Sequence, residues 1–268
     1  MTQTMAGAEE IAVAGSPERF GYSWGTYAEL LPVHEEQFRR WTAPLQPEDW
    51  RGVKFLDAGC GMGRNSYWPL RDGAAQAVAI DLDDRTLASA RQTLAPFANV
   101  EIRKQSIYDI PEENAFDIAF SIGVVHHLAE PERAVARLAR TVKPGGTVIV
   151  WLYGREGNGW IVHFFNPLRL RLLSRMPLPM VHGLSWWLTA ALWLALRPNL
   201  STSPYLRQIR GFSFRHLRAI VFDHMIPRIA LYYRREEALA LLAQAGLTDV
   251  QAYWTNRMSW TVHGRKPA

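Results

Sequence analysis

The sequence predicts an α/β fold in which a doubly wound, mostly parallel sheet is covered by helices on both faces. Two observations predict this fold. Between residues 53 and 153, short apolar runs alternate with helix-forming segments, and the first run ends in a glycine-rich turn at residues 57–65. A third observation predicts a helical insertion, because residues 154–233 break the alternation. Ligands of such sheets bind beyond the carboxyl ends of the strands, so the glycine-rich turn predicts the location of the site.

The strands are predicted from apolar runs bounded by turn residues, a pattern typical of strands that are buried on both faces. The chain after the insertion contains two further strand-like runs, which we expect to pair as a terminal hairpin that closes the sheet. The expected parallel strands cover residues 53–57, 77–81, 100–104, 116–120 and 147–153, and the hairpin strands cover 248–253 and 259–264.

The helices are predicted from signals at their ends. Asp83 or Asp84 suits the N-cap of one helix, and Pro131 suits the first turn of the next. Residues 143–146, which read Lys-Pro-Gly-Gly, are expected to stop that helix, and Gly246 is expected to end the last one. The predicted helices cover residues 65–71, 84–94, 131–141 and 235–245.

The chain divides into five segments by composition. Small and polar residues dominate the beginning of the chain, and aromatic residues punctuated by prolines follow. We therefore predict a mobile tail at residues 1–17, a helical aromatic lead-in at 18–52, the core of the sheet at 53–153, a basic and apolar helical insertion at 154–233, and a final helix with closing strands at 234–268.

Composition excludes several classes of protein. Of the 268 residues, 48% are hydrophobic and 21% charged, which excludes wholesale disorder. Cys60 is the single cysteine, so an intramolecular disulfide and a cysteine-based zinc site are excluded. The first seventeen residues have no apolar core of a secretory signal, and no run of eighteen apolar residues occurs. The eight histidines show no ligand spacing. We expect a cytoplasmic protein that uses no metal.

Four signals occur in order along the predicted sheet. Glycines 59, 61 and 63 follow Asp57, whereas a dinucleotide fingerprint would place its third glycine at position 64, which is Arg64. Asp81 lies twenty residues after Gly61, at the end of the second predicted strand, where a carboxylate can accept hydrogen bonds from ribose hydroxyls. The third and fourth signals are residues 116–127, which include Ser121 and a His-His pair, and residues 143–146. In this combination the sequence resembles the class I S-adenosylmethionine-dependent methyltransferases.

The resemblance covers residues 53–153 and the closing strands, and it implies a seven-stranded, Rossmann-like methyltransferase sheet with the insertion after the fifth strand. It also implies that S-adenosylmethionine is the cofactor and S-adenosylhomocysteine the product. At residue 106 this chain has a serine where the family often has an aspartate, so adenine recognition is expected to depend more on the backbone of Ile107. The implied cofactor residues are Gly59, Gly61 and Gly63 along the methionine part, Asp57 at its amino group, Ser121 through its backbone, Asp81 at the ribose, and Leu82, Ser106 and Ile107 around the adenine.

Two further groups are candidates for the chemistry. His126 and His127 follow the fourth predicted strand at the rim of the site, where one of them could act as a general base; a supporting role in the cofactor loop is the alternative. Tyr22 and Trp24 lie in an aromatic lead-in, and segments of this kind fold over the cofactor in related methyltransferases. There they would shield the sulfonium and contact it through cation–π attraction, with ordinary core packing as the alternative.

The insertion predicts an anionic or apolar partner. Residues 155–235 hold twelve arginines, no lysine and two acids. Residues 169–175 interleave arginine with leucine, and residues 183–196 are apolar on every face. Three interpretations remain open: a lid or homodimer-forming subdomain, a peripheral membrane contact through residues 169–196, and a nucleic-acid groove, against which the solid apolar run argues.

The sequence therefore predicts an enzyme that transfers a methyl group from S-adenosylmethionine to an oxygen, or less favourably a nitrogen, of an anionic or amphipathic small molecule. A glycan precursor, a phosphorylated metabolite and a lipid-linked intermediate all fit the basic insertion. The alternatives are a nucleic-acid methyltransferase and a non-catalytic cofactor-binding module.

Overall fold

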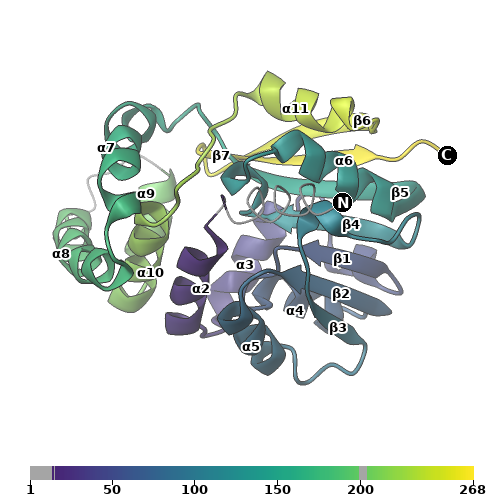
Figure 1. The fold of residues 1–268 in the computed structure, drawn as a ribbon, viewed down its shortest axis with the longest axis horizontal. Helices are drawn as coiled ribbons and strands as arrows, with labels where there is room; N and C mark the ends of the chain where they lie inside the picture. The colour runs from purple at the N-terminus through teal and green to yellow at the C-terminus, as the bar shows by residue number, and fades with distance from the viewer. Residues whose placement is uncertain (1–13, 15, 199–203) are drawn as a thin grey trace, which may run out of the picture.

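A central sheet organises the computed structural model, which describes residues 14, 16–198 and 204–268 (Figure 1). Its seven strands lie in the order β3-β2-β1-β4-β5-β7-β6, and β7 runs antiparallel to both of its neighbours, β5 and β6. The predicted sheet, including the closing hairpin, is confirmed. The strands are β1 (Lys54–Ala58), β2 (Gln76–Asp81), β3 (Val100–Lys104), β4 (Phe116–Ile122), β5 (Val142–Tyr153), β6 (Thr248–Thr255) and β7 (Ser259–Arg265).

Helices cover both faces of the sheet and one of its ends. The helix predicted at residues 131–141 ends as expected at Thr141, but the chain then continues directly into β5, so residues 143–146 form the start of a strand. The expected mobile tail lies mostly outside the described residues, and its last residue, Pro17, already begins a helix.

The helices are α2 (Pro17–Thr26), α3 (Pro32–Trp41), α4 (Arg64–Arg71), α5 (Asp84–Thr93), α6 (Pro131–Thr141), α7 (Asn166–Arg171), α8 (Leu178–Leu196), α9 (Pro204–Arg210), α10 (Phe214–Met225) and α11 (Arg235–Gln244).

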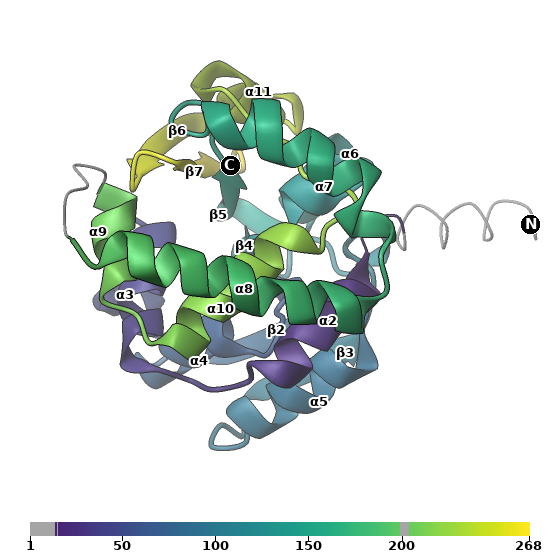
Figure 2. The ribbon, with the colours of Figure 1, turned by 90° about the vertical axis from the view of Figure 1, so that its left-hand side faces the viewer.

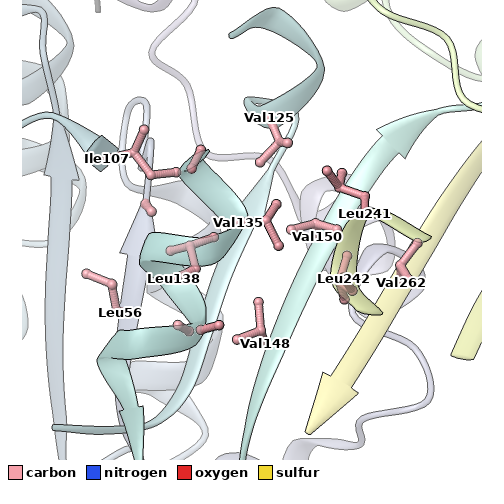
Figure 3. Packing of buried hydrophobic residues seen from close by; sticks show 14 of the residues in the cluster. Leu56, Ile107, Val125, Val135, Leu138, Val148, Val150, Leu241, Leu242 and Val262 are labelled. Carbon is pink, nitrogen blue, oxygen red and sulfur yellow. The ribbon is translucent and has the colours of Figure 1, made fainter. Parts of the chain in front are cut away.

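The larger core cluster lies between the sheet and the pair α6 and α11 (Figure 3). Val135 and Leu138 recur at helical spacing on α6 and face Leu56 of β1 and Val148 of β5 (Figure 3). Each such side chain contributes roughly 1.5–3 kcal/mol when fully buried. A second cluster, which includes Phe55 and members of α4 and α5, covers the other face. The sheet is therefore fixed by apolar burial on both sides.

The strand order reverses between β1 and β4. From β1 the chain builds outward through β2 to β3, and it then crosses back to place β4 on the other side of β1. In a doubly wound sheet this reversal opens a crevice at the carboxyl ends of the two strands. The glycine-rich turn after β1 lies at this crevice.

Helices α7 to α10, here called the cap, stand beyond the carboxyl end of the sheet (Figures 1 and 2). The two ends of the insertion lie side by side, because Tyr233 donates a backbone hydrogen bond to Tyr153 (2.9 Å) and accepts one from Arg155 (2.8 Å). Among the described residues, no helix has both the length and the apolar character needed to cross a membrane.

Helix α2 connects the cap to the core. The buried guanidinium of Arg19 donates to the backbone carbonyls of Leu173 (3.1 Å) and Ile226 (2.7 Å), both in the cap region. On its other side α2 packs on α5, and a Cβ added to Gly21 would lie 2.0 Å from the carboxyl carbon of Asp83. Asp83 is the N-cap of α5, where its side chain accepts from the backbone of Arg85 and Thr86. The absence of a side chain at residue 21 thus permits this contact.

We expect Gly21→Ala to lower the melting temperature, because the added methyl would displace the Asp83 carboxylate from its capping position. Loss of a cap and local overpacking each destabilise by about 1 kcal/mol or more. Gly25→Ala is the matched control on the same helix, since its Cβ would meet only Arg85 at 4.0 Å. The control should gain roughly 0.5–1 kcal/mol of stability. Equal melting temperatures for the two variants would contradict the packing described here.

Candidate functional site

A cavity of about 310 Å³ lies between the carboxyl end of the sheet, α2, α3 and the cap. One end is formed by the glycine-rich turn and the ends of β2 and β4, and the other by α9 and α10. Six of the residues predicted to hold the cofactor line it, namely Trp24, Gly59, Gly61, Asp81, Leu82 and Ile107. The cap cavity, as it is called below, therefore joins the predicted cofactor region to the insertion.

The glycine-rich turn has a backbone that other residues rarely adopt. Gly59, Gly61 and Gly63 have φ values of 82°, 55° and 81°. A Cβ at Gly59 would lie 2.4 Å from the side chain of Val124, so this glycine allows the turn to pack against the segment after β4. Gly63 is the N-cap of α4, and its Cα faces Leu94 and Ala90 rather than the cavity. The first two glycines therefore border the cavity, and the third positions α4.

Asp81 lines the cavity at the end of β2. Its Oδ2 accepts from the backbone N–H of Gly61 (3.0 Å), and its Oδ1 accepts from those of Leu82 (2.7 Å) and Asp83 (3.3 Å). Burial raises the pKa of this carboxyl, and the backbone donors act against that shift. Oδ1 thus already accepts two hydrogen bonds, whereas Oδ2 accepts one and keeps a second lone pair. Asp81 can therefore accept a further hydrogen bond from a ligand hydroxyl through Oδ2.

Two buried acceptors beside the glycine-rich turn have no hydrogen-bond partner: Oδ1 of Asp57 and Oδ1 of Asn65. The other oxygen of Asp57 accepts from Ser66 Oγ (2.7 Å), and burial raises the pKa of Asp57 to about 7. Asn65 lines the cavity, whereas Asp57 lies behind it. A ligand that donates hydrogen bonds from an ammonium group would satisfy such acceptors. With the Asp81 carboxylate, these groups fit S-adenosylmethionine.

Arg64 follows the turn and lies between two indole rings. Its guanidinium carbon is 4.8 Å from the ring of Trp24 and 5.4 Å from that of Trp41. Burial lowers the pKa of Arg64 to about 10, so it remains charged near neutral pH. In the sequence, residue 64 is notable only because a dinucleotide fingerprint would have a glycine there. The structure instead places a fixed positive charge at the wall of the cap cavity.

Three other predicted residues lie outside the cavity. Tyr22 packs against Phe222 and His182 in the cluster between α2 and the cap. Ser106 caps the short helix after β3 by accepting from the N–H of Tyr108 (3.2 Å), and the buried Ser121 hydroxyl donates to Ala58 O (2.7 Å). Because these side chains do not line the cavity, its geometry does not support a contact between them and a ligand. A role for the backbone of Ser121 stays a prediction.

The two adjacent histidines have different surroundings. His126 is fully buried outside the cavity, stacks on Tyr153 at 3.9 Å, and has no hydrogen-bond partner for either ring nitrogen. His127 lines the cavity, and its Nδ1 is 2.6 Å from the carbonyl oxygen of Ile229. Burial lowers the pKa of His126 well below its usual value and that of His127 to about 3. Both imidazoles are neutral and poorly basic, and His126 cannot touch a ligand in the cavity.

A carboxylate from the cap stands opposite the glycine-rich turn. Asp223, on α10, lines the cavity, and its Oδ1 accepts from Ser23 Oγ (2.5 Å). Burial raises its pKa to about 6, while Ser23 and the charge of Arg64 act in the opposite direction. Asp223 is one of the two acids of the arginine-rich segment 155–235. The signal that could have singled it out is an acid in an otherwise arginine-rich segment.

Aromatic and basic groups surround this carboxylate. Tyr153, Tyr232 and His224 line the same region, with the ring of Tyr153 5.5 Å from Tyr232 and 5.7 Å from His224. Arg169 lies fully buried behind them and makes no ion pair with any described residue. Its charge contributes to the lowered pKa values of His127 and His224. This end of the cavity therefore combines an apolar surface with a buried positive charge that makes no ion pair with a described residue.

Metal ligands are not clustered in the part of the chain that the structure describes. There, no three histidine, cysteine, aspartate or glutamate side chains are placed to hold a metal ion. Cys60 is buried in the glycine-rich turn, and burial raises the pKa of its thiol well above the usual value.

Comparison with known proteins agrees with this geometry. Residues 56–150 match the family described as "Methyltransferase domain". The chain is 34% identical over 114 residues to the tRNA U34 carboxymethyltransferase of Pseudoalteromonas translucida, a match that covers 41% of this chain and 35% of that protein. It is 31% identical over 141 residues to the ubiquinone biosynthesis O-methyltransferase of Hahella chejuensis, covering 52% of this chain and 59% of the relative.

Solved structures are similar over most of the chain. The 1,6-didemethyltoxoflavin-N1-methyltransferase of Burkholderia thailandensis, which contains S-adenosylhomocysteine, has a TM-score of 0.53 at 17% identity, covering 86% of this chain and 78% of that one. This likeness concerns the fold. The matches to the curated relatives span about a third to three fifths of those proteins, so their acceptors are not carried over.

We expect Asp81→Asn to weaken binding of S-adenosylhomocysteine. Hydrogen bonds to a charged group contribute about 1.5–3 kcal/mol, which corresponds to roughly 10- to 100-fold in the dissociation constant. Isothermal titration calorimetry measures the change. Asp84→Asn is the matched control, because Asp84 is exposed and pairs with Lys104 (2.6 Å). If Asp81→Asn binds as tightly as the control, Asp81 does not hold the ligand.

Proposed function

Because the chain carries a class I S-adenosylmethionine-dependent methyltransferase domain, we propose that it transfers a methyl group to a hydroxyl oxygen of an amphipathic, anionic small molecule held in the cap cavity. The observation that carries this proposal is Asp223. Its partly buried carboxylate lines the cavity, and burial raises its pKa to about 6. A hydroxyl acceptor benefits from such a base, whereas an amine needs mainly positioning.

Residues of this chain would perform three tasks in the reaction. S-adenosylmethionine supplies a methyl group on a sulfonium, whose carbon–sulfur bond breaks with both electrons kept by sulfur as the carbon–oxygen bond forms. Asp223 accepts the hydroxyl proton of the acceptor, and Ser23 holds the Asp223 carboxylate through the 2.5 Å hydrogen bond. Asp81 and the glycine-rich turn orient the cofactor, and α2 and the cap exclude water.

The acceptor class is inferred from the wall of the cavity. Tyr153, Tyr232 and Phe212 provide apolar surface, and Arg64 and Arg169 provide positive charge in or behind the wall. A phosphorylated or lipid-linked hydroxyl compound, or an acidic sugar, fits this combination. Two of the most similar relatives have different names, one for tRNA and one for ubiquinone biosynthesis, and the position of the cavity between the sheet and the cap favours the small molecule.

Substitution of Asp223 tests the proposal. Asp223→Asn should reduce turnover by about 100-fold or more, because a general base contributes roughly 10²–10⁴. Release of S-adenosylhomocysteine is measured with a panel of phosphorylated, acidic-sugar and lipid-linked alcohols, and with total tRNA as the competing acceptor. Glu29→Gln is the matched control, an acid that lines the cavity but pairs with Arg215 (3.3 Å) at its exposed side.

Two outcomes would contradict the proposal. A loss of only a few fold in Asp223→Asn, with unchanged S-adenosylhomocysteine binding, would show that no base is needed at this position. Methylation of tRNA, with none of the small alcohols accepted, would assign the site to nucleic acid.

The expected pH dependence of kcat/KM follows from the pKa of Asp223. A base must be deprotonated, so kcat/KM should rise with pH and level off above about 6, the pKa of this carboxyl. The low pKa of His127, about 3, excludes it as the source of a transition near 6. The rising limb should be missing from Asp223→Asn. A limb that persists in this variant would assign the transition to another group.

A further inference from the structure

The outer surface of the cap exposes large apolar side chains. Figure 2 shows α7 and α8 on the side of the cap that faces away from the sheet. The most exposed of these side chains are Phe164 (77%), Trp187 (69%), Leu194 (68%) and Trp160 (63%). Leu168, Leu172 and Met180 are also exposed. We call the exposed apolar residues of 160–194 the outer cap face.

Helix α8 is apolar on its exposed side as well as on its buried side. Its buried residues are Val181, Ser185, Thr189 and Leu196, while Met180, Leu184 and Trp187 recur at helical spacing on the exposed side. The buried hydroxyls donate to carbonyls of their own helix, Ser185 to His182 (2.7 Å) and Thr189 to Ser185 (2.6 Å). A surface helix in water normally carries polar residues on its exposed side. The pattern indicates that the exposed side has an apolar partner.

The surroundings of the face are basic. Residues 157–222 contain eight arginines and no acid. Arg171, Arg175 and Arg197 are exposed beside the apolar residues, and none makes an ion pair with a described residue. Tryptophan with arginine at an apolar surface is typical of segments that lie in the interface of a bilayer.

Such a face could be covered by a second copy of this chain or by a lipid bilayer. Charge distinguishes between these two occupants. In a symmetric dimer the same patch meets itself, so the arginine-rich surroundings of the two copies would be brought together. An anionic bilayer offers hydrocarbon for the tryptophan and leucine side chains and negative headgroups for the arginines. The chemistry of the face therefore favours the lipid.

We propose that the outer cap face docks on an anionic lipid bilayer, with Trp187 and Leu194 of α8 in the interface and Arg171 and Arg175 at the headgroups. Helix α8 packs on α10, where Arg218 donates to His182 O (2.7 Å) and Ser185 Oγ (3.2 Å). Helix α10 also carries Asp223. Docking would therefore leave only α8 between the lipid and α10, which forms part of the wall of the cap cavity. An amphipathic acceptor in the bilayer requires the cavity to lie at such a position.

Co-sedimentation with vesicles tests this proposal without cofactor or acceptor, so its failure leaves the proposed reaction untouched. The probes are vesicles of phosphatidylcholine alone and of phosphatidylcholine mixed with phosphatidylglycerol. The full-length protein should sediment with the anionic vesicles and only weakly with the neutral ones. Added salt should reduce binding without abolishing it, because part of the affinity is apolar.

Three variants make the test specific. Trp187→Ser should lower partitioning roughly tenfold or more, since a large aromatic surface is removed. Arg171→Glu combined with Arg175→Glu should lower binding to anionic vesicles only. Leu231→Ser is the matched control, because Leu231 is an exposed apolar residue outside the cap. This variant should bind the vesicles as the parent protein does.

Two results would overturn the proposal. One is the absence of sedimentation with anionic vesicles at low salt. The other is a dimer, seen by analytical ultracentrifugation without lipid, that Trp187→Ser dissociates, since this would assign the face to a second copy of the chain.

Discussion

The position of the cap depends on the buried guanidinium of Arg19. A fully charged side chain with little access to water needs hydrogen bonds for its donors, and Arg19 finds them on the carbonyls of Leu173, Met176 and Ile226. Leu173 and Met176 lie between α7 and α8, and Ile226 follows α10, whereas Arg19 belongs to α2. One residue thus ties α2 to the cap, and the same helix brings Ser23 to Asp223 and Trp24 to the glycine-rich turn.

This arrangement gives the cavity two chemically different ends. At the sheet, Asp81 and the unpaired oxygen of Asn65 provide acceptors beside the glycine-rich turn, and Arg64 provides a positive charge. At the cap, Asp223 shares the wall with rings of tyrosine and histidine. Burial affects these groups in opposite directions: it raises the pKa of Asp223 to about 6 and lowers that of His127 to about 3. As a result, a carboxylate rather than an imidazole is suited to take a proton near neutral pH.

The cap also has two different surfaces. Its inner side carries Asp223 on α10, and its outer side carries Trp187 and Leu194 on α8. The sequence of α8 is apolar throughout, so its pattern alone could not indicate which side faces the protein. The packing of Arg218 against His182 and Ser185 settles that question, because it turns the hydroxyl side of the helix inward.

The sequence alone determined the fold and predicted most of the residues that line the sheet end of the cavity. Alternating apolar runs require burial on both faces, and glycine spacing with Asp81 at the end of a strand is local information, readable within a few residues. The sequence did not decide that Tyr22 packs between α2 and the cap or that His126 lies outside the cavity, because burial depends on neighbours far along the chain. Nor could it select Asp223, which lies 200 residues from Ser23. Only the tertiary structure brings such residues together, since α2 and α10 meet through packing that no local pattern encodes.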